Sequence, residues 1–334
     1  EMLLRASEKY GQTIPWYIMT SPLNDQATRN YFGDNQFFGL EPNNVTFFPQ
    51  GTLPAFDFNA KALLEAKDSL ALSPDGHGGA FDALSQSGAL ADMKRRGIEH
   101  ITYWQVDNPL VQPFEPLFIG LHDQLGSDMS SRSLTKTGPD EKLGNFCIVD
   151  GKLTIIEYSD LPRELATQTD DTGQLRFRAG SPAIHILRRD FAERVGERHI
   201  KLPFHKAVKK VSYINEAGEQ IEPADPNAVK LEKFVFDALP FANAPLVLEA
   251  VRNEQFAPVK NATGVDSVES SRHLMMERAA HWLEKAGINV PRNAEGSLDC
   301  RIEMSPRTWL DEEDVAANAD QLEQPAPQAE VYHP

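Results

Sequence analysis

Three polar segments follow apolar runs that have the length of buried strands. Gln50 follows the run VTFF, the loop SPDGHGG covers residues 73–79, and Asp107 and Asn108 follow the run ITYWQV. In an open α/β sheet, ligands bind at the carboxyl ends of strands. These three positions are therefore the first candidates for binding chemistry.

The residue types in these segments suit a nucleotide and its phosphates. Glycines at positions 76, 78 and 79 let backbone amides approach a ligand closely and leave room for a flat base. Asp107 could hold Mg²⁺ against phosphates, because Mg²⁺ prefers one or two carboxylates together with substrate oxygens. Taken singly, each segment also has a structural interpretation, since the loop could be a tight turn and Asp107 a helix cap.

The elements that must position these residues alternate between strand and helix. The apolar pattern predicts strands at 14–20, 44–50 and 98–106, helices at about 24–32 and 115–125, and two short helices between residues 80 and 96, with Gly97 as their terminal cap. This alternation is typical of a parallel α/β sheet.

The second half of the chain is richer in strands. Residues 145–149 and 153–158 flank the Asp150–Gly151 turn, which predicts a hairpin. Residues 234–236 and 246–251 are further strand candidates. The clearest helix runs from a cap at Asp266 to Gly287, and the Pro- and Gln-rich segment from about Gln321 is expected to be a flexible tail.

Composition excludes several classes of protein. The chain has 334 residues, 41% of them hydrophobic, and a formal charge of −16, which argues against a nucleic-acid groove. No apolar run could span a membrane and residues 1–12 contain no signal core, so we expect a cytoplasmic protein without a membrane partner. The two cysteines, Cys147 and Cys300, lack metal-site spacing and are interpreted as structural thiols.

Nine ordered blocks together resemble the UDP-N-acetylhexosamine and UDP-glucose pyrophosphorylase family over roughly residues 5–285. They are PWYIMTS (15–21), YFG with FFGL (31–40), NVTFFPQGTLPA (44–55), SPDGHGG (73–79), DMKRRGIEH (92–100), VDNPLV (106–111), IIEYSD (155–160), KLEKFVFD (230–237) and FAPVKNA (256–262). The resemblance implies a Rossmann-like, GT-A-like mixed sheet flanked by helices. It also implies a catalytic domain over residues 1–288, with a β-rich sugar-binding part at about 130–260, and a C-terminal segment over 289–334.

The family resemblance also implies a role for individual residues. Asp107 matches the metal and phosphate ligand, and Lys260 matches the lysine that contacts the sugar phosphate. The uridine-binding positions are Gln50, Gly76 and His77, and the sugar-binding positions are Gly144, Glu157, Phe234 and Phe236. Without the resemblance, Phe234 and Phe236 could be one face of a strand and Glu157 an exposed hairpin residue.

Two departures from the family pattern affect these expectations. The family begins with a strand and a Gly-rich phosphate loop, and this chain opens after them, so we expect a truncated form that could be inactive alone. Ile184 stands where the hexosamine enzymes have an asparagine that faces the N-acetyl group, which leaves both N-acetylglucosamine-1-phosphate and glucose-1-phosphate open.

The implied activity is a UTP-dependent uridylyltransferase with Mg²⁺ as cofactor. UTP and a sugar-1-phosphate would react to give a UDP-sugar and pyrophosphate. The chain is expected to be a monomer or a weak homo-oligomer. The alternative is a nucleotide-binding module of the same fold without catalysis. A dehydrogenase or a hydrolase is disfavoured, because the chain has no GxGxxG after a strand, no GxSxG and no HExxH.

One spatial hypothesis underlies the assignment. Gln50, His77, Asp107, Glu157, Phe234 and Lys260 must converge on a single cleft at one edge of the sheet. If Asp107 and Lys260 lay on opposite sides of the molecule, the assignment would fail.

Overall fold

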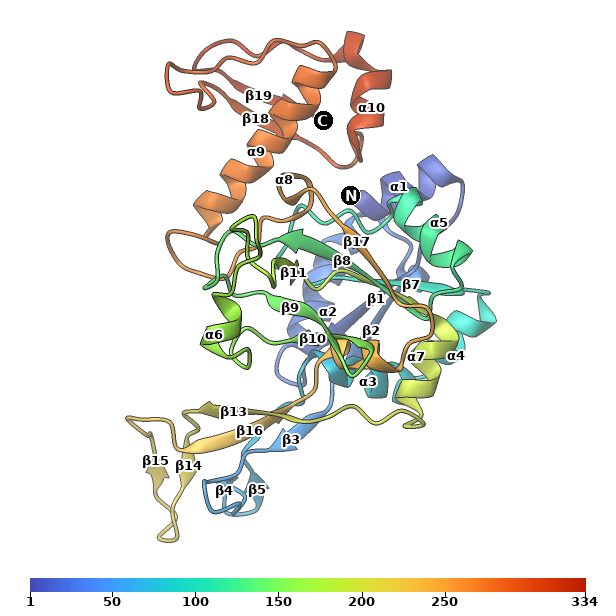
Figure 1. The fold of residues 1–334 in the computed structure, drawn as a ribbon. Coiled ribbons are helices and arrows are strands. Elements are labelled where there is room, and N and C mark those ends of the chain that lie inside the picture. The colour runs from blue at the N-terminus through green and yellow to red at the C-terminus, as the bar shows by residue number, and fades with distance from the viewer.

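The computed structural model describes all 334 residues and centres on a mixed seven-stranded sheet (Figure 1). The strands lie in the order β10-β9-β11-β8-β12-β7, and β17 pairs with β8. The β17–β8 pair is parallel and the other pairs are antiparallel. The bounds are β7 His100–Tyr103, β8 Met129–Thr135, β9 Gly144–Val149, β10 Lys152–Ile156, β11 Ala179–Ser181, β12 His185–Arg188 and β17 Leu246–Glu249. The mixed α/β architecture implied by the resemblance is confirmed. The parallel sheet predicted from the strand–helix alternation is wrong for β7, which pairs with β12 in antiparallel register.

The predicted strand–helix–strand unit at the N-terminal side is also confirmed. Strand β1 (Trp16–Thr20) leads through α2 (Asp25–Asp34) to β2 (Val45–Pro49), and the two strands pair in parallel. They form a separate two-stranded sheet. Because parallel strands end at the same edge, Gln50 lies beside Thr20 and its backbone N–H donates to the Thr20 carbonyl at 2.8 Å.

The strongest turn signal in the sequence gives the predicted hairpin. Strands β9 and β10 pair in antiparallel register, with Leu153 opposite Ile148. Asp150 and Gly151 both have positive φ angles, 50° and 77°, as a two-residue turn between strands with right-handed twist requires.

The strand predicted at 234–236 is wrong. Residues Val235–Phe241 form a 3-10 helix, η4, and the side chain of Asp237 accepts a hydrogen bond from the Phe234 N–H at 3.3 Å. That local bond satisfies a donor that a strand would have paired with its neighbour. Apolar alternation alone could not reveal this competition.

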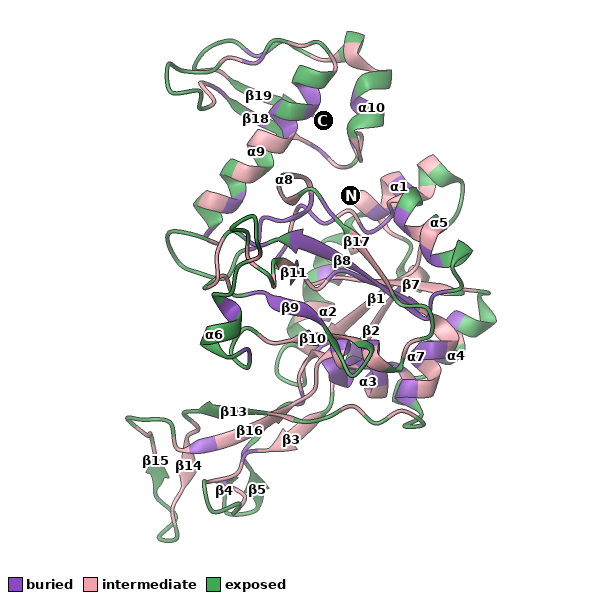
Figure 2. Ribbon diagram, viewed as in Figure 1, coloured by how far each residue is buried: buried purple, intermediate pink, exposed green.

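Helices on one side of the sheet form the main core. Helices α3 (Ala80–Gln86), α4 (Ala89–Arg95) and α7 (Arg189–Gly196) pack with η4 in a cluster of 18 buried residues that includes Phe81, Met93 and Phe191. Figure 2 shows the buried residues concentrated in these helices and in the central strands. The two short helices predicted after the glycine-rich loop are α3 and α4, and Gly97 follows α4 with a φ of 72°.

A β-rich extension, which we call the β-arm, projects from the main body (Figure 1). Its small hydrophobic core is formed by the buried residues Ala55, Leu63, Ala71 and Ala228. Its strands are β3 (Thr52–Pro54), β4 (Leu64–Ala66), β5 (Ser69–Leu70), β6 (Leu72–Pro74), β13 (His205–Lys209), β14 (Tyr213–Ile214), β15 (Gln220–Ile221) and β16 (Ala228–Glu232). The pairs β3–β6 and β13–β16 connect the β-arm to the loops around the candidate site.

The C-terminal unit packs on the long helix α9 (Val268–Lys285) and has its own core around Trp282 and Trp309. It contains β18 (Arg301–Met304), α10 (Glu312–Ala317) and β19 (Glu330–His333). The segment from about Gln321, expected to be a flexible tail, ends in β19, which pairs in parallel with β18. Val331 and His333 are buried there, a two-residue period that the Pro-rich composition before it obscured. Ser267, rather than Asp266, caps α9.

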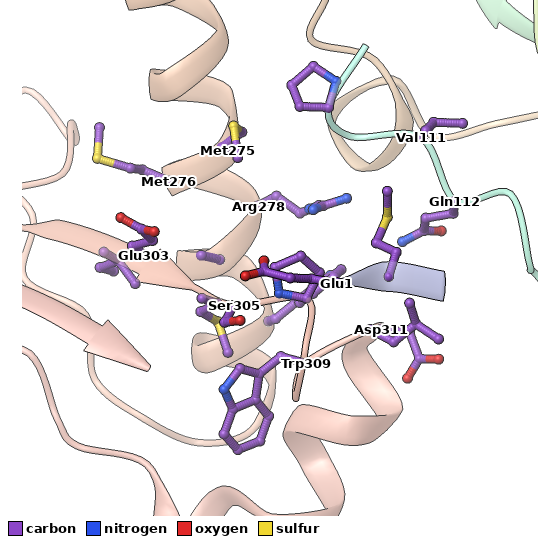
Figure 3. Close-up of a pocket in the computed structure, with 18 of the residues that line it drawn as sticks. Glu1, Val111, Gln112, Met275, Met276, Arg278, Glu303, Ser305, Trp309 and Asp311 are labelled. Atoms are coloured by element: carbon purple, nitrogen blue, oxygen red, sulfur yellow. The ribbon is translucent and has the colours of Figure 1, made fainter. Parts of the chain in front are cut away.

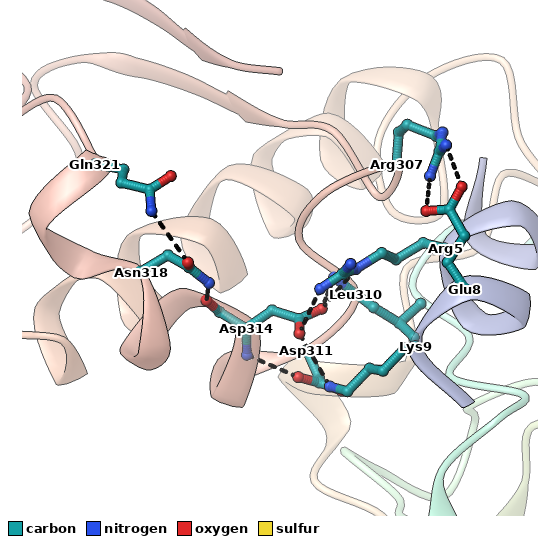
Figure 4. A network of polar contacts seen from close by, with 9 residues as sticks. All are labelled: Arg5, Glu8, Lys9, Arg307, Leu310, Asp311, Asp314, Asn318 and Gln321. Carbon is teal, nitrogen blue, oxygen red and sulfur yellow. Dashed lines mark hydrogen bonds and ion pairs between the residues drawn. The ribbon is translucent and has the colours of Figure 1, made fainter. Parts of the chain in front are cut away.

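The remaining helices cover the edges of the body. They are α1 (Met2–Tyr10), α5 (Pro116–Gln124), α6 (Arg163–Ala166) and α8 (Arg252–Gln255), and α5 confirms the helix predicted at 115–125. Helix α1 contacts the C-terminal unit through a network of ion pairs (Figure 4). Cys147 and Cys300 are both free and buried. The chain contains no helix with the length and apolarity needed to span a bilayer.

Candidate functional site

The structure brings Asp107 and Lys260 together. Lys260 Nζ lies 3.8 Å from Asp107 Oδ2, and the backbone N–H of Val259 donates to the Asp107 carbonyl at 2.9 Å. Both side chains remain partly open, with 24% of Asp107 and 42% of Lys260 exposed. A carboxylate and an ammonium held side by side and open to solvent can meet a ligand that carries both phosphate and a cation.

Asn108 holds the segment before Lys260 in place. Its buried amide donates to the Gln255 carbonyl at 2.7 Å and accepts from the Ala257 N–H at 3.0 Å. These two hydrogen bonds satisfy the backbone carbonyl of Gln255 and the backbone N–H of Ala257, which have no partner in a sheet. The sequence placed Asn108 beside Asp107 but gave no sign of this contact.

The glycine-rich loop forms a tight turn against the chain that leads into Phe234. Gly76 has a φ of 85°, and a Cβ there would lie 2.4 Å from the Lys233 carbonyl oxygen, so no other residue fits without a shift. The N–H of Gly78 donates to that carbonyl at 2.8 Å. The Asp75 N–H donates to the Gly51 carbonyl at 3.1 Å, which places the turn next to Gln50.

His77 lies within a group of aromatic rings. Its ring centroid is 5.1 Å from that of Phe234 and 6.3 Å from that of Tyr103. Burial, and to a smaller degree the charge of His205, lowers the pKa of His77 to about 4. Its Nδ1 accepts a hydrogen bond from the Val235 N–H at 3.1 Å, so the neutral ring must carry its hydrogen on Nε2.

The positions predicted to bind sugar are Gly144, Glu157, Phe234 and Phe236. Burial raises the pKa of Glu157. A Cβ at Gly144 would lie 3.9 Å from Glu157 Oε1, which places the two predicted sugar contacts beside each other. Phe236 belongs to the main core, and its ring centroid is 5.1 Å from that of Phe234.

Tyr103 connects the aromatic group to the Asp107–Lys260 pair. It lies at the end of β7, and burial is the main reason that its pKa rises to about 12. Asp107 is close enough for its charge to contribute to this rise. Ring contacts therefore run from Tyr103 through His77 to Phe234, and the charge of Asp107 acts on Tyr103. Asp107 and Lys260, on which the spatial hypothesis depends, lie together.

Several residues of this region had no signal in the sequence. His185 is fully buried, its ring centroid is 5.8 Å from that of Tyr103, and burial lowers its pKa to about 3. His205 and Asp237 adjoin Phe234. Ile184 is 4% exposed. No spacing rule joins these positions, because strand pairing across the β-arm and the central sheet brings them together.

The residues present fit a metal ion that arrives with phosphates rather than a cage made by the protein. No group of three or more His, Cys, Asp and Glu side chains could hold a metal ion. Asp107 offers one half-open carboxylate. Mg²⁺ usually keeps several waters and takes one or two carboxylates together with substrate phosphates, so this arrangement is sufficient.

A large cavity lies elsewhere, between the main body and the C-terminal unit (Figure 3). Its volume is about 1130 Å³, and α9, α1 and the loop after Asn108 form its walls. Figure 3 shows Met275 and Arg278 of α9 facing Gln112 across it. None of the residues predicted to bind uridine, sugar or metal lines this cavity.

Comparison with known proteins is consistent with this geometry. The family model described as UTP–glucose-1-phosphate uridylyltransferase matches residues 2–307. A UDP-N-acetylhexosamine pyrophosphorylase-like protein 1 from Xenopus tropicalis is 39% identical over 84% of this chain and 56% of its own length. The UDP-N-acetylglucosamine pyrophosphorylase of Saccharomyces cerevisiae is 38% identical over 83% of this chain and 60% of its own length.

A solved structure shares the fold over the whole chain. It is named as a candidate UDP-N-acetylglucosamine pyrophosphorylase from Entamoeba histolytica and matches with a TM-score of 0.84 and 32% identity, covering 100% of this chain and 82% of its own. The present chain thus spans a little over half the length of the curated relatives it matches.

Proposed function

Because the chain belongs to the UTP–glucose-1-phosphate uridylyltransferase family, we propose that it carries out transfer of a uridylyl group from UTP to a hexose-1-phosphate. The products are a UDP-sugar and pyrophosphate. The observation that carries the proposal is the convergence of Asp107 and Lys260, whose Oδ2 and Nζ atoms lie 3.8 Å apart. The contact between the rings of His77 and Phe234 supports it. N-acetylglucosamine-1-phosphate and glucose-1-phosphate are the two acceptors to compare.

The reaction needs positioning and charge neutralisation more than proton transfer. An oxygen of the sugar phosphate attacks the α-phosphorus of UTP, a new P–O bond forms, and the bond to pyrophosphate breaks. The attacking oxygen is already an anion, so no general base is required. The side chain of Lys260 would neutralise charge on the sugar phosphate and hold the attacking oxygen in line with the bond that breaks. This lowers the activation barrier, because the negative charges are most crowded in the transition state.

Mg²⁺, when bound, would draw charge from the phosphate oxygens. Asp107 is the residue proposed to hold it, and the backbone bond from Val259 keeps Asp107 beside Lys260. The lysine and the cation would then act on neighbouring phosphates. Their close spacing supports a shared role rather than two separate sites.

The two ends of the product would be held by different groups. We assign the uracil and ribose to Gln50, Gly76 and His77, which offer a tight glycine turn and a neutral imidazole. The sugar would contact Glu157 and Phe234. Gly144 lies beside Glu157, where a Cβ would come within 2.6 Å of Ile155. Phe236 would support Phe234 from the core.

A pyrophosphate-release assay tests the proposal. The protein is incubated with UTP, Mg²⁺ and either N-acetylglucosamine-1-phosphate or glucose-1-phosphate, and CTP replaces UTP in the control. We expect turnover that requires the sugar phosphate and falls with CTP. Calorimetric binding of UTP without any turnover would contradict catalysis and favour a binding module of the same fold.

A further inference from the structure

His205 occupies a position that the proposed mechanism does not use. It is the first residue of β13, and the β13–β16 pairing places it opposite Glu232, two residues before Phe234 (Figure 1). Its ring centroid is 4.4 Å from that of Phe234, which is closer than the centroid of His77. His205 and His77 therefore both contact the aromatic ring of Phe234.

Asp237 joins His205 to the backbone of Phe234. His205 Nε2 donates to Asp237 Oδ2 at 2.8 Å, and the same oxygen accepts from the Phe234 N–H at 3.3 Å. The Asp237 side chain is only 10% exposed, so this bond is largely shielded from water. Each of His205, Asp237 and Phe234 therefore contacts the other two, which fixes their positions relative to one another.

His205 also faces the acidic groups around Glu157. Its Nδ1 is 3.8 Å from Asp160 Oδ2. Burial raises the pKa of Glu157 most, the negative charges of Asp160 and Asp237 add to this rise, and the charge of His205 opposes it. The imidazole therefore lies between the carboxylates of Asp160 and Asp237, near the proposed sugar contact.

We propose that His205, held by Asp237, is a positioning residue for the sugar end of the site: it fixes the ring of Phe234. The inference rests on the proposed function, because it takes Phe234 and Glu157 as contacts of the sugar. His205 itself touches neither the phosphates nor the reacting atoms. Its effect should therefore fall on recognition of the sugar and leave the uridine end unchanged.

Two variants separate the ring from the hydrogen bond. H205F keeps an aromatic ring against Phe234 but loses the donor to Asp237, and H205Q keeps a donor without the aromatic ring. We expect H205F to raise the KM for the sugar-1-phosphate about tenfold, the size of one lost hydrogen bond to a charged group. The KM for UTP and kcat should stay within about twofold, and H205Q should recover part of the loss. His199, an exposed histidine on the loop before β13, gives the matched control H199F, which should change neither KM.

A binding experiment judges the same inference without turnover. Calorimetry compares the affinities of UMP and of UDP-N-acetylglucosamine, with UDP-glucose in parallel. H205F should weaken the UDP-sugar and spare UMP. Equal weakening of both ligands, or no change in either, would overturn the role of His205. Absence of turnover in the unaltered protein would instead contradict the proposed function, so the two ideas fail by different results.

Discussion

Lys260 is the residue whose loss should affect the reaction most directly. Its ammonium lies beside Asp107 and is 42% exposed, so it is held in place yet open to a phosphate. We expect K260A to lower kcat by about a hundredfold, as for the loss of other groups that stabilise charge in a transition state. Pyrophosphate release at saturating UTP is the measurement.

A second lysine provides the control for charge alone. Lys206 is exposed on β13 and forms no ion pair. K206A changes net charge as K260A does, and it should leave kcat within about twofold, because an exposed lysine without an ion-pair partner contributes little. A near-normal rate in K260A would remove Lys260 from the mechanism.

At this scale the sequence predicted the residues that directly follow strands or lie in family-like blocks. Gln50 lies beside the turn that holds Gly76 and His77, and Asp107 lies beside Lys260. It missed His205 and Asp237, whose importance depends on which strands pair in the β-arm. An isolated histidine in a polar segment carries no signal for such a contact.

At the scale of elements, the close approach of α3 and α7 holds the main core behind the site. A Cβ at Gly196 would lie 2.5 Å from the Phe81 carbonyl oxygen, which is backbone and cannot move aside without shifting α3. We expect G196A to lower the free energy of unfolding by about 1–3 kcal/mol through overpacking. Urea unfolding followed by circular dichroism measures the change.

The matched control is a glycine with free space around it. Gly120 lies in α5, and a Cβ there would meet nothing within 4 Å. Because alanine favours the helix over glycine, G120A should raise the free energy of unfolding by about 0.5–1 kcal/mol. If both variants shifted stability in the same direction, the close contact of α3 and α7 would not be the cause.

The predicted elements succeeded where a local signal decides the structure. The hairpin of β9 and β10 follows from the Asp150–Gly151 turn, and α5 from its apolar pattern. The region 234–236 failed because the side chain of Asp237 competes for a backbone donor. Strand β19 was missed because the Pro-rich composition before it obscured its two-residue period, and because α10 separates it from its partner β18 in the sequence.

At the scale of the whole molecule, buried neutral histidines should make stability depend on pH. Burial is the main cause that lowers the pKa of His77 and His122 to about 4 and of His185 to about 3. In the unfolded chain these groups titrate near 6.5. Between about pH 6.5 and 4 the unfolded chain therefore binds more protons, and stability falls as pH is lowered through this window.

Replacing one of these histidines should flatten the dependence. His122 lies on α5, away from the candidate site, and H122Q can keep a hydrogen bond to Ser130. We expect the loss of stability between pH 7 and pH 4.5 to shrink by about 1–3 kcal/mol, the energy of a shift of one to two pKa units. Urea unfolding at both pH values measures it. An unchanged difference in H122Q would show that His122 is not among the groups that titrate on unfolding.

The ends of the chain are held together mainly by charge. In Figure 4, Asp314 of α10 accepts from Arg5 at 2.9 Å and lies 3.1 Å from Lys9 Nζ, while Arg307 pairs with Glu8. Burial opposes ionisation of Asp314, but bonds from Arg5, the Leu310 N–H and Lys9 outweigh it and lower its pKa. Asp314 therefore stabilises the fold at pH values above its pKa in the unfolded chain. This contribution is lost as the pH falls through the lower pKa that Asp314 has in the folded protein.

Removal of Asp314 should loosen the C-terminal unit from α1 before it unfolds the body. D314A leaves Arg5 and Lys9 without their shielded partner, so we expect a loss of about 2–4 kcal/mol and faster hydrogen exchange in α10 and β19. The exposed pair Arg301–Glu330 gives the control R301A, which should change stability by less than about 1 kcal/mol. Since the main core does not include α10, exchange in α3 and α7 should stay slow. Equal acceleration of hydrogen exchange in α3 and α10 would mean that the main body and the C-terminal unit unfold together. The ion pairs of Asp314 would then not control a separate unfolding of the C-terminal unit.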